Sequence, residues 1–181
     1  MLDGDKKLIK DAIMGEAEAF GLLYDRYQPQ IYRFIYLKVS HREEAEDLTH
    51  QVFLKSWENI AEYESSNFPF SSWLYRIARN QTIDYYRTKK SHLSLEKEGG
   101  LEIENDERPL AELSDDLMDL EKIRKAIGYL SDDQQNVIIL RFIEDLSPKE
   151  TADIMGKTEG SVKLLQHRAI KKLKELTQNE R

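Results

Sequence analysis

The chain has 181 residues, no cysteine, and a formal net charge of −7 from 27 Lys and Arg against 34 Asp and Glu. This length allows one ordinary domain or two small ones. The lack of cysteine excludes disulfides and thiolate metal sites, and it fits a reducing cytoplasm, where we expect the protein to act. No apolar run has the length of a signal-peptide core or of a membrane span, so we expect no membrane insertion.

The negative charge is concentrated in one short segment. Residues 1–93 hold 13 Lys and Arg against 14 Asp and Glu, and residues 121–181 hold 12 against 10. Residues 94–120, between them, hold 2 against 10. Because local patches rather than the overall charge select partners, the acidic total does not exclude nucleic acid.

Signals for helices run through the first half of the chain, and strand signals are nearly absent. Apolar residues recur at helical spacing, as in Phe20, Leu23, Tyr24, Tyr27 and Ile31. The sequence Ser-His-Arg-Glu at residues 40–43 is typical of a capping box at the start of the next helix. These patterns predict an all-α fold.

Glu46, Asp47 and His50 have the spacing of neighbours on a helix, which makes a carboxylate–histidine metal site conceivable. No second motif of this kind accompanies them, and the sequence has no glycine-rich phosphate loop and no nucleophile elbow. A solvated helix face is the better interpretation. We therefore expect no enzymatic activity, no metal and no cofactor.

The segment over residues 67–90 predicts a helix with two different faces. A core-facing side is shared by Trp73, Leu74, Ile77, Ala78 and Tyr85. A separate stripe, about 100° wide by helix geometry, holds Arg76, Arg79, Asn80, Ile83 and Arg87, with Trp73 on one flank and Tyr75 and Tyr86 on the other. The preceding polar loop ends with Asn67 and Phe68.

This stripe has the composition of a platform for single-stranded nucleic acid. Arginine binds phosphates, asparagine reaches base edges, and aromatic rings stack on unpaired bases. The short loop before the helix is suited to contact an extruded base. The alternative is that the aromatic residues form core and the arginines a solvated face, and for Trp73 and Tyr85 this alternative is favoured.

Residues 94–116 predict an acidic flexible linker. They combine a Gly-Gly pair, one proline and a dense run of acidic residues, which together cannot bury enough apolar surface to order themselves. We therefore expect two small helical domains, at residues 1–93 and 117–181.

Residues 146–176 predict a helix-turn-helix. Capping boxes begin at Ser131 and Ser147, and Pro148 follows the second at the first helical position. Gly156 suits the left-handed backbone of a sharp turn, and Thr158 can cap the next helix. A short helix, a glycine turn and a longer basic helix are the parts of this DNA-binding motif.

The second helix of this motif divides into an apolar and a basic side. The apolar stripe is formed by Val162, Leu165, Ala169, Leu173 and Leu176. From Lys157 to Lys174 there are six basic residues and one acidic residue. The basic side can neutralise phosphates, and the first turns can enter a major groove, where Leu164 could touch a thymine methyl. A solvated lysine-rich helix end would explain the last turn but not the preceding helix and turn.

Three stretches together resemble the extracytoplasmic-function sigma factors of bacterial RNA polymerase, which have sigma-70 regions 2 and 4 only. They are EEAEDLTHQVFLKSWENI (43–60), FSSWLYRIARNQTIDYYR (70–87) and LSPKETADIMGKTEGSVKLLQHRAIKKL (146–173). The resemblance implies a region 2 domain at residues 1–93, a region 4 domain at 117–181, and a linker that threads channels of the polymerase. It also implies an anti-sigma factor that holds the protein inactive.

The first stretch resembles the family surface that docks on the coiled coil of the β′ subunit, and region 4 is expected to meet the β flap. The resemblance assigns core-polymerase binding to Asp47, Leu48, Gln51, Val52, Phe53 and Leu54. His50 and Gln51 depart from the family pattern and remove one negative charge, which changes the charge complementarity expected there.

The resemblance also assigns the two promoter elements. Recognition and melting of the −10 element are expected from Asn67, Phe68, Trp73, Arg76, Arg79, Asn80 and Arg87. Recognition of the −35 element is expected from Thr158, Glu159, Ser161, Lys163, Leu164, His167, Arg168 and Lys171.

Two other functions are compatible with part of the sequence. A helix-turn-helix regulator that never enters polymerase would explain residues 146–176 but not the stretches at 43–60 and 70–87. A protein that uses apolar helix faces to bind another helix could coexist with a sigma factor, because an anti-sigma factor is such a partner.

Overall fold

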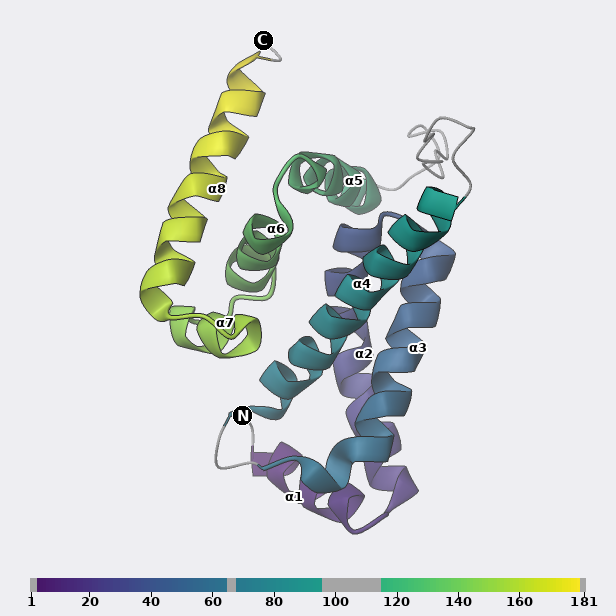
Figure 1. Cartoon of the computed structure of the whole chain (residues 1–181). Coiled ribbons are helices and arrows are strands. Elements are labelled where there is room, and N and C mark those ends of the chain that lie inside the picture. The colour runs from purple at the N-terminus through teal and green to yellow at the C-terminus, as the bar shows by residue number, and fades with distance from the viewer. Residues whose placement is uncertain (1–2, 65–67, 96–114, 180–181) are drawn as a thin grey trace.

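The computed structural model describes residues 3–64, 68–95 and 115–179 (Figure 1). These residues form helices and their connections, with no strand among them, which confirms the all-α prediction. The elements are α1 (Asp3–Ile13), α2 (Ala17–Val39), α3 (Arg42–Asn59), the 3-10 turn η1 (Ile60–Glu62), α4 (Phe70–Leu95), α5 (Asp115–Gly128), α6 (Asp132–Ile138), the π-helical turn η3 (Ile139–Ile143), α7 (Pro148–Met155) and α8 (Glu159–Asn179).

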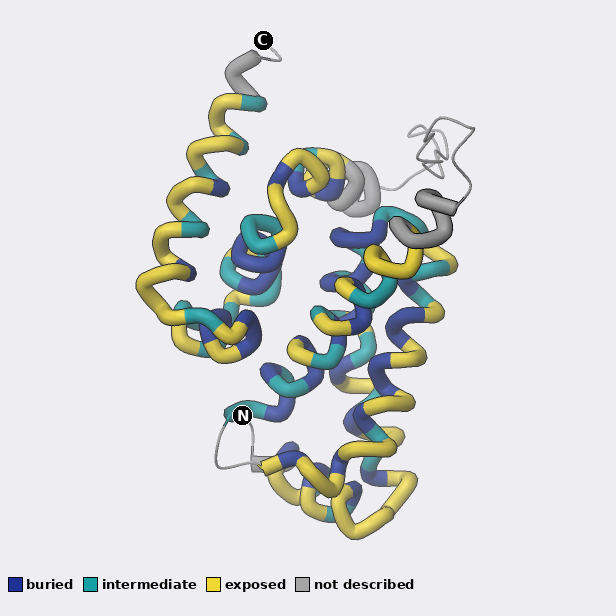
Figure 2. The backbone as a smooth tube through the Cα atoms, in the orientation of Figure 1, coloured by how far each residue is buried: buried dark blue, intermediate teal, exposed yellow. Residues whose placement is uncertain are grey.

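The N-terminal half is a bundle of α2, α3 and α4, with α1 across one end (Figure 1). The sides of these helices that face each other are buried, and their outer sides are exposed (Figure 2). Leu23, Ile31 and Phe34 of α2 are fully buried, as are Val52 of α3 and Leu74 of α4. The 3.6-residue spacing of apolar residues therefore places one face of each helix in a common core.

An aromatic cluster fixes the connection between η1 and α4. Tyr63 lies 5.3 Å from Phe70 and 5.4 Å from Trp73 between ring centroids, and Tyr27 lies 5.4 Å from Phe70. The Tyr63 hydroxyl also donates a hydrogen bond to the Phe68 carbonyl at 2.9 Å. These contacts hold the start of α4, and with it the aromatic–arginine segment, against α2 and the residue that follows η1.

In the C-terminal half, α7 and α8 form the predicted helix-turn-helix. The Ser147 hydroxyl accepts from the Glu150 amide at 3.1 Å, and the Ser147 amide donates to the Glu150 carboxylate at 2.9 Å, which confirms the capping box. Gly156 ends α7 with φ +62°. The Thr158 hydroxyl accepts from the Ser161 amide at 3.2 Å and so caps α8.

The capping box predicted at Ser40 is wrong. Ser40 ends α2 in the left-handed conformation, with φ 63°, and its amide donates to the Tyr36 carbonyl. His41 is the residue before α3, which begins at Arg42. Because the connection between these two helices is so short, Ser40 completes the first helix and cannot also cap the second.

The predicted linker at 94–116 falls mostly outside the described residues. At its edges, α4 continues to Leu95 and α5 begins at Asp115, so both helices extend two residues further than predicted. None of the described helices is both long and apolar enough to cross a membrane.

Candidate nucleic-acid interface

The two predicted sides of α8 are present in the structure. Val162 and Ala169 are fully buried against the other helices of the C-terminal half. Leu165, Leu173 and Leu176 are half-buried on the same side. The apolar stripe therefore anchors α8, and the remaining side of the helix faces solvent.

The solvent-facing side of α8, together with Thr158 just before the helix, carries all of the side chains predicted to read the −35 element. Leu164 is 50% exposed, an unusual position for leucine on a basic surface. Lys171 is close to Glu175 on the next turn, at 3.9 Å, with both side chains largely solvated. The exposed set is Thr158, Glu159, Ser161, Lys163, Leu164, His167, Arg168 and Lys171. In Figure 1, α8 lies on the far side of the C-terminal half from α2 and α3.

The arginine stripe of α4 is mostly solvent-exposed. Arg76, Asn80 and Arg87 are exposed, and Ile83 is 38% exposed. The Arg76 guanidinium lies over the Phe68 ring, 5.0 Å from its centroid, a cation–π contact that orients both side chains. Asn67, predicted to act beside Phe68, lies outside the described residues.

Arg79 differs from its neighbours on the stripe. Its side chain is half-buried, its charge acts on Lys38 of α2, and its Nε is buried without a hydrogen-bond partner. Arg79 therefore offers less of its surface to a nucleic acid than Arg76 does.

Two of the aromatic side chains expected to flank the stripe belong to the protein core. Tyr75 is only 1% exposed, so its predicted place on a base-stacking platform is wrong. Its ring packs edge-on against Phe34 at 5.5 Å. Trp73 is half-buried in the aromatic cluster, as the core alternative predicted. Tyr86 keeps 42% exposure, although its hydroxyl donates to the Lys38 carbonyl at 2.5 Å.

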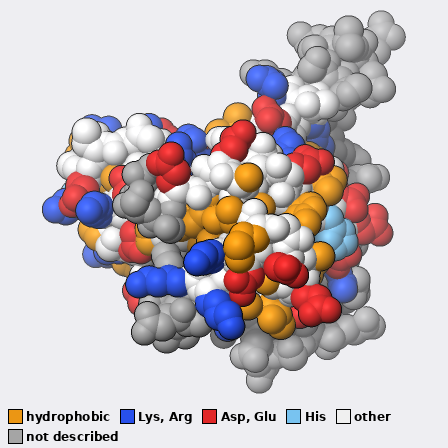
Figure 3. Space-filling view, turned by 90° about the horizontal axis from the view of Figure 1, so that it is seen from below, with side chains coloured by type: hydrophobic (Ala, Val, Ile, Leu, Met, Phe, Trp, Pro, Cys, Tyr) orange, Lys and Arg blue, Asp and Glu red, His pale blue; other side chains and the backbone are white. Residues whose placement is uncertain are grey.

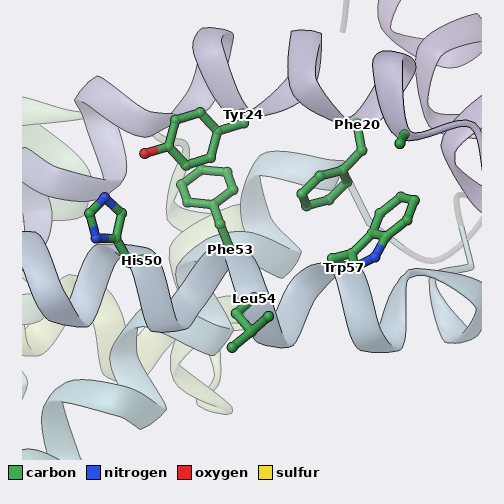
Figure 4. Close-up of a pocket in the computed structure, with 7 residues that line it drawn as sticks. Phe20, Tyr24, His50, Phe53, Leu54 and Trp57 are labelled. Carbon is green, nitrogen blue, oxygen red and sulfur yellow. The ribbon is translucent and has the colours of Figure 1, made fainter.

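A groove of about 350 Å³ opens between α2 and α3. Phe20 and Tyr24 of α2 face Phe53 and Trp57 of α3 across it (Figure 4). Phe20 and Trp57 lie 4.9 Å apart between centroids, and Tyr24 and Phe53 lie 4.7 Å apart. The sequence did not single out Phe20, Tyr24 or Trp57 for binding, because aromatic residues at helical spacing are equally typical of a core.

The residues predicted to dock on polymerase fall into two groups. Asp47, Gln51 and Leu54 are exposed on α3, and Leu54 is 59% exposed beside the groove. Leu48, Val52 and Phe53 are buried, at 7%, 0% and 3% exposure. The prediction that the side chains of Leu48 and Val52 contact polymerase directly is therefore wrong for this conformation, because these side chains pack in the bundle core. Phe53 reaches only the floor of the groove.

The conceivable metal site on α3 has no support in the described residues, where no group of three or more metal-ligating side chains gathers. Glu46 instead accepts a hydrogen bond from Arg42 at 2.8 Å.

Charged contacts join the two halves of the chain. Arg33 of α2 donates two hydrogen bonds to the Glu144 carboxylate, at 2.8 and 2.7 Å, and the Tyr75 hydroxyl donates a third at 2.8 Å. Lys38 of α2 contacts Asp132 at 2.5 Å and donates to the Asn136 amide oxygen at 2.7 Å. Each of these contacts brings the C-terminal half against α2 and α4.

Burial changes the acid–base behaviour of these groups. The pKa of Lys38 is lowered by desolvation, although the nearby Asp132 carboxylate opposes this shift. The pKa of Tyr75 is raised by burial and also by the Glu144 carboxylate.

One feature of the sequence could have indicated the contacts between the two halves. Lys38 interrupts the apolar run Phe34–Val39, where a charge at a core position requires a buried partner.

Seen from below, the surface shows hydrophobic side chains with Lys, Arg, Asp and Glu around them (Figure 3). Charges of both signs are interspersed, in agreement with the near-neutral balance of residues 1–93 and 121–181. This face therefore presents no broad positive field, and the side-chain sets on α4 and α8 remain the predicted nucleic-acid contacts.

Sequence comparisons identify both halves of the chain. The family described as Sigma-70 region 2 matches residues 23–92, and the family described as Sigma-70, region 4 matches residues 120–173. The ECF RNA polymerase sigma factor BldN of Streptomyces coelicolor is 36% identical over 170 residues, which are 94% of this chain and 64% of BldN. The ECF RNA polymerase sigma factor SigW of Bacillus subtilis is 34% identical over 177 residues, which are 93% of this chain and 94% of SigW.

Solved structures agree with this assignment to the sigma factors. The sigma factor RpoE of Bartonella quintana, crystallised with the anti-sigma factor NepR, aligns with a TM-score of 0.74 and 27% identity over 90% of this chain and 98% of RpoE. CnrH, solved with the cytosolic domain of CnrY, shares the fold, with a TM-score of 0.77, 22% identity, and coverage of 99% of this chain and 100% of CnrH. The chain therefore belongs to the extracytoplasmic-function sigma factors of the sigma-70 family.

Proposed function

We propose that this sigma factor directs core RNA polymerase to promoters by reading the −35 element with α8 and capturing the opened −10 strand with α4. The observation that carries this proposal is the presence of two separate exposed surfaces for nucleic acid, one in each half of the chain. One is a basic helix after a glycine turn, suited to duplex DNA. The other is an arginine–asparagine stripe beside aromatic residues, suited to a single strand.

The division of labour follows from the chemistry of each surface. On α8, Lys163 and His167 lie in the turns that can enter a major groove, and Arg168 and Lys171 lie where phosphates would pass. On α4, Arg76 is exposed over the Phe68 ring and Asn80 is exposed one turn further along, where we expect a strand that has left the duplex to pass. We assign region 2 to residues 1–93 and region 4 to residues 117–181 on this basis.

Melting requires the polymerase. Stacking one base on an aromatic side chain contributes on the order of 1–3 kcal/mol, so a few contacts capture an open strand but do not open many base pairs. The remaining binding energy must come from docking on the core enzyme. The exposed side chains Asp47, Gln51 and Leu54, together with the aromatic groove beside them, supply a docking surface for the β′ coiled coil.

An anti-sigma factor is a further partner that we propose. RpoE was crystallised with one, and RpoE aligns with 98% of its chain to this protein. Exposed apolar side chains such as Leu54, Phe142 and Tyr129 offer surface for such a partner. Since transcription takes place in the bacterial cytoplasm, we place the protein there.

Reconstitution with core polymerase and a promoter library tests the proposal, with specific transcripts as the readout. Permanganate footprinting of the holoenzyme should show thymine reactivity near −10, and Arg76→Ala or Asn80→Ala should reduce it while leaving closed-complex binding less affected. Lys10→Ala, at an exposed position on α1, is the control.

One result would favour the competing function. Tight, sequence-specific binding to duplex DNA by the free protein, without any transcript after core polymerase is added, would identify a helix-turn-helix regulator instead.

A further inference from the structure

The side chain of Arg141 joins three parts of the C-terminal half. Its Nε donates a hydrogen bond to Oε1 of Gln166 on α8 at 3.2 Å, and its Nη1 donates to the Leu146 carbonyl, directly before the capping box of α7. We propose that Arg141 is a positioning residue for −35 recognition. Through Gln166 it fixes the rotation of α8 about its own axis, and this rotation decides which base edges the exposed side chains reach. This inference rests on the function proposed for α8.

The backbone around Arg141 is fixed before its side chain reaches α8. Arg141 lies in the π-helical turn η3, where Ile139 and Leu140 are fully buried. The Leu146 amide donates to the Leu140 carbonyl at 2.9 Å, and the Glu144 amide donates to the Ile139 carbonyl at 3.0 Å. The guanidinium on this turn is planar and presents its N–H donors in a fixed fork, which suits it to hold two acceptors at once. Arg141 can therefore hold a side chain of α8 in one place relative to η3.

Gln166 lies at the edge of the buried side of α8, next to side chains predicted to read bases. At about 100° per residue, Gln166 is roughly 40° round the helix from Val162, which is fully buried. Lys163 and His167 follow in the same direction, roughly 60° and 100° beyond Gln166, and both are exposed. The hydrogen bond from Arg141 therefore holds α8 at the edge that borders its predicted base-reading residues.

A second polar contact holds the opposite edge of α8. The Lys172 ammonium donates to the carbonyl of Tyr129, the residue that directly follows α5. Lys172 lies roughly 80° from Val162 in the other direction. Burial of apolar surface is non-directional, whereas hydrogen bonds are directional, so we expect the two polar contacts to set the rotation of the helix within the limits that its packing allows. Because Lys172 is exposed and Gln166 is half-buried, the contact with Arg141 is the better protected of the two.

A small rotation of α8 would disturb base contacts much more than phosphate contacts. A helix with its side chains is about 10–12 Å across, so a rotation of ~20° moves a side-chain tip by about 2 Å. Hydrogen bonds to base edges tolerate a variation of only about 0.5 Å in length. The attraction of a flexible cationic side chain to phosphates is mainly electrostatic and has no such narrow geometry. Loss of the contact between Arg141 and Gln166 should therefore lower sequence discrimination without changing the number of phosphates that α8 neutralises.

Binding of the full-length protein to two DNA duplexes tests this inference. One duplex carries the −35 element of a promoter that the holoenzyme transcribes, the other carries a scrambled −35 sequence, and fluorescence anisotropy gives both affinities at several salt concentrations. Gln166→Leu removes the acceptor and keeps a side chain of similar size and helix propensity. We expect it to lower the ratio of the two affinities about fivefold or more, the contribution of one base contact, and to leave the salt slope unchanged.

Three further variants separate positioning from general loosening. Gln166→Glu keeps the acceptor oxygen and should keep the ratio of the wild type. Arg141→Lys loses the planar fork and should lower the ratio, and its combination with Gln166→Leu should lower it no further. Gln135→Leu is the matched control, because it removes a half-buried hydrogen bond of the same length, 3.2 Å to the Leu130 carbonyl, in the same half of the chain but not on α8. Thermal unfolding followed by circular dichroism reports the stability of each variant.

The outcomes separate this inference from the proposed function. A wild-type ratio in Gln166→Leu would overturn the inference, and so would an equal loss in Gln166→Leu and Gln135→Leu. A lower ratio together with a smaller salt slope would also overturn it, because α8 would then have lost phosphate contacts rather than its alignment. A lower ratio in Gln166→Leu at an unchanged slope, with the ratio retained in Gln166→Glu, supports it. A wild-type protein without preference between the two duplexes would instead contradict the proposed function of α8, and the inference with it.

Discussion

At the scale of single residues, a change of charge at Asp47 can test docking on core polymerase without disturbing the fold. Asp47 is exposed on α3, so its replacement removes no packing. We expect Asp47→Arg to weaken binding to core polymerase by about tenfold or more, because reversal of an interfacial charge converts attraction into repulsion. The affinity for core polymerase, measured with labelled sigma factor, checks this.

Asp153→Arg is the matched control, since Asp153 is equally exposed but lies on α7 in the C-terminal half. Unchanged affinity after Asp47→Arg would remove this side chain from the docking surface. Phe53→Ala would be a poorer test, because truncation of a buried phenylalanine costs about 3–5 kcal/mol of stability.

Arg168 on the exposed side of α8 makes a second prediction at this scale. If Arg168 contacts a phosphate, Arg168→Ala should weaken binding to every duplex sequence and lower the slope of log K against log salt by about 0.9. Lys10→Ala on α1 should change neither quantity. Fluorescence anisotropy at several salt concentrations measures both, and an unchanged slope would mean that α8 docks in another orientation.

Prediction from the sequence was most accurate for residues whose role depends on one helix alone. The apolar stripe of α8 and the exposure of Arg76 and Arg87 on α4 follow from helical periodicity, and both are confirmed. Tyr75 was assigned wrongly because its place depends on Phe34 and on Glu144, which is 69 residues away in sequence. No local pattern encodes a partner at that separation.

At the scale of elements, the turn between α7 and α8 depends on Gly156. Its φ of +62° is costly for any residue with a Cβ, although no atom lies within 4 Å of the position that a Cβ would take. We expect Gly156→Ala to lower the free energy of unfolding by about 1–2 kcal/mol through backbone strain alone. Thermal unfolding followed by circular dichroism checks this.

Gly128→Ala is the control for this prediction. Gly128 also has free space around it, but it ends α5 without a positive φ. Alanine there should leave the stability unchanged or raise it by about 0.5–1 kcal/mol. Equal destabilisation by the two substitutions would show that the turn geometry is not the cause.

Helix boundaries were predictable where a cap acts on a single helix. Ser147 and Gly156 carry out their predicted roles, because each is followed or preceded by enough chain to form its own turn. Ser40 did not, because α2 and α3 follow each other so closely that one residue must end the first helix. Competition between adjacent helices for a shared residue is not visible in a capping pattern.

At the scale of the whole molecule, the hydrogen bonds of Arg33 and Tyr75 to Glu144, which join the two halves of the chain, should affect the two nucleic-acid surfaces differently. In Figure 1, α8 lies on the far side of the C-terminal half from α2 and α3, and none of its exposed residues takes part in these hydrogen bonds. We therefore expect Tyr75→Phe to leave the affinity of the free full-length protein for a −35 duplex unchanged.

The same substitution should have a different effect on a long promoter fragment that carries both elements as a −35 duplex and a premelted −10 bubble. Once the two halves separate, the protein can contact both sites on one fragment, and linked contacts raise affinity through effective concentration without any new interaction. Tyr75→Phe should therefore tighten binding to this fragment by about three- to tenfold, because loss of the hydrogen bond to Glu144 favours separation of the halves by about that factor. Electrophoretic mobility shifts with the two DNAs measure both affinities. Equal tightening on both DNAs would mean that Tyr75 acts through α8 itself, and no tightening on the long fragment would mean that the contacts between the two halves do not limit promoter binding.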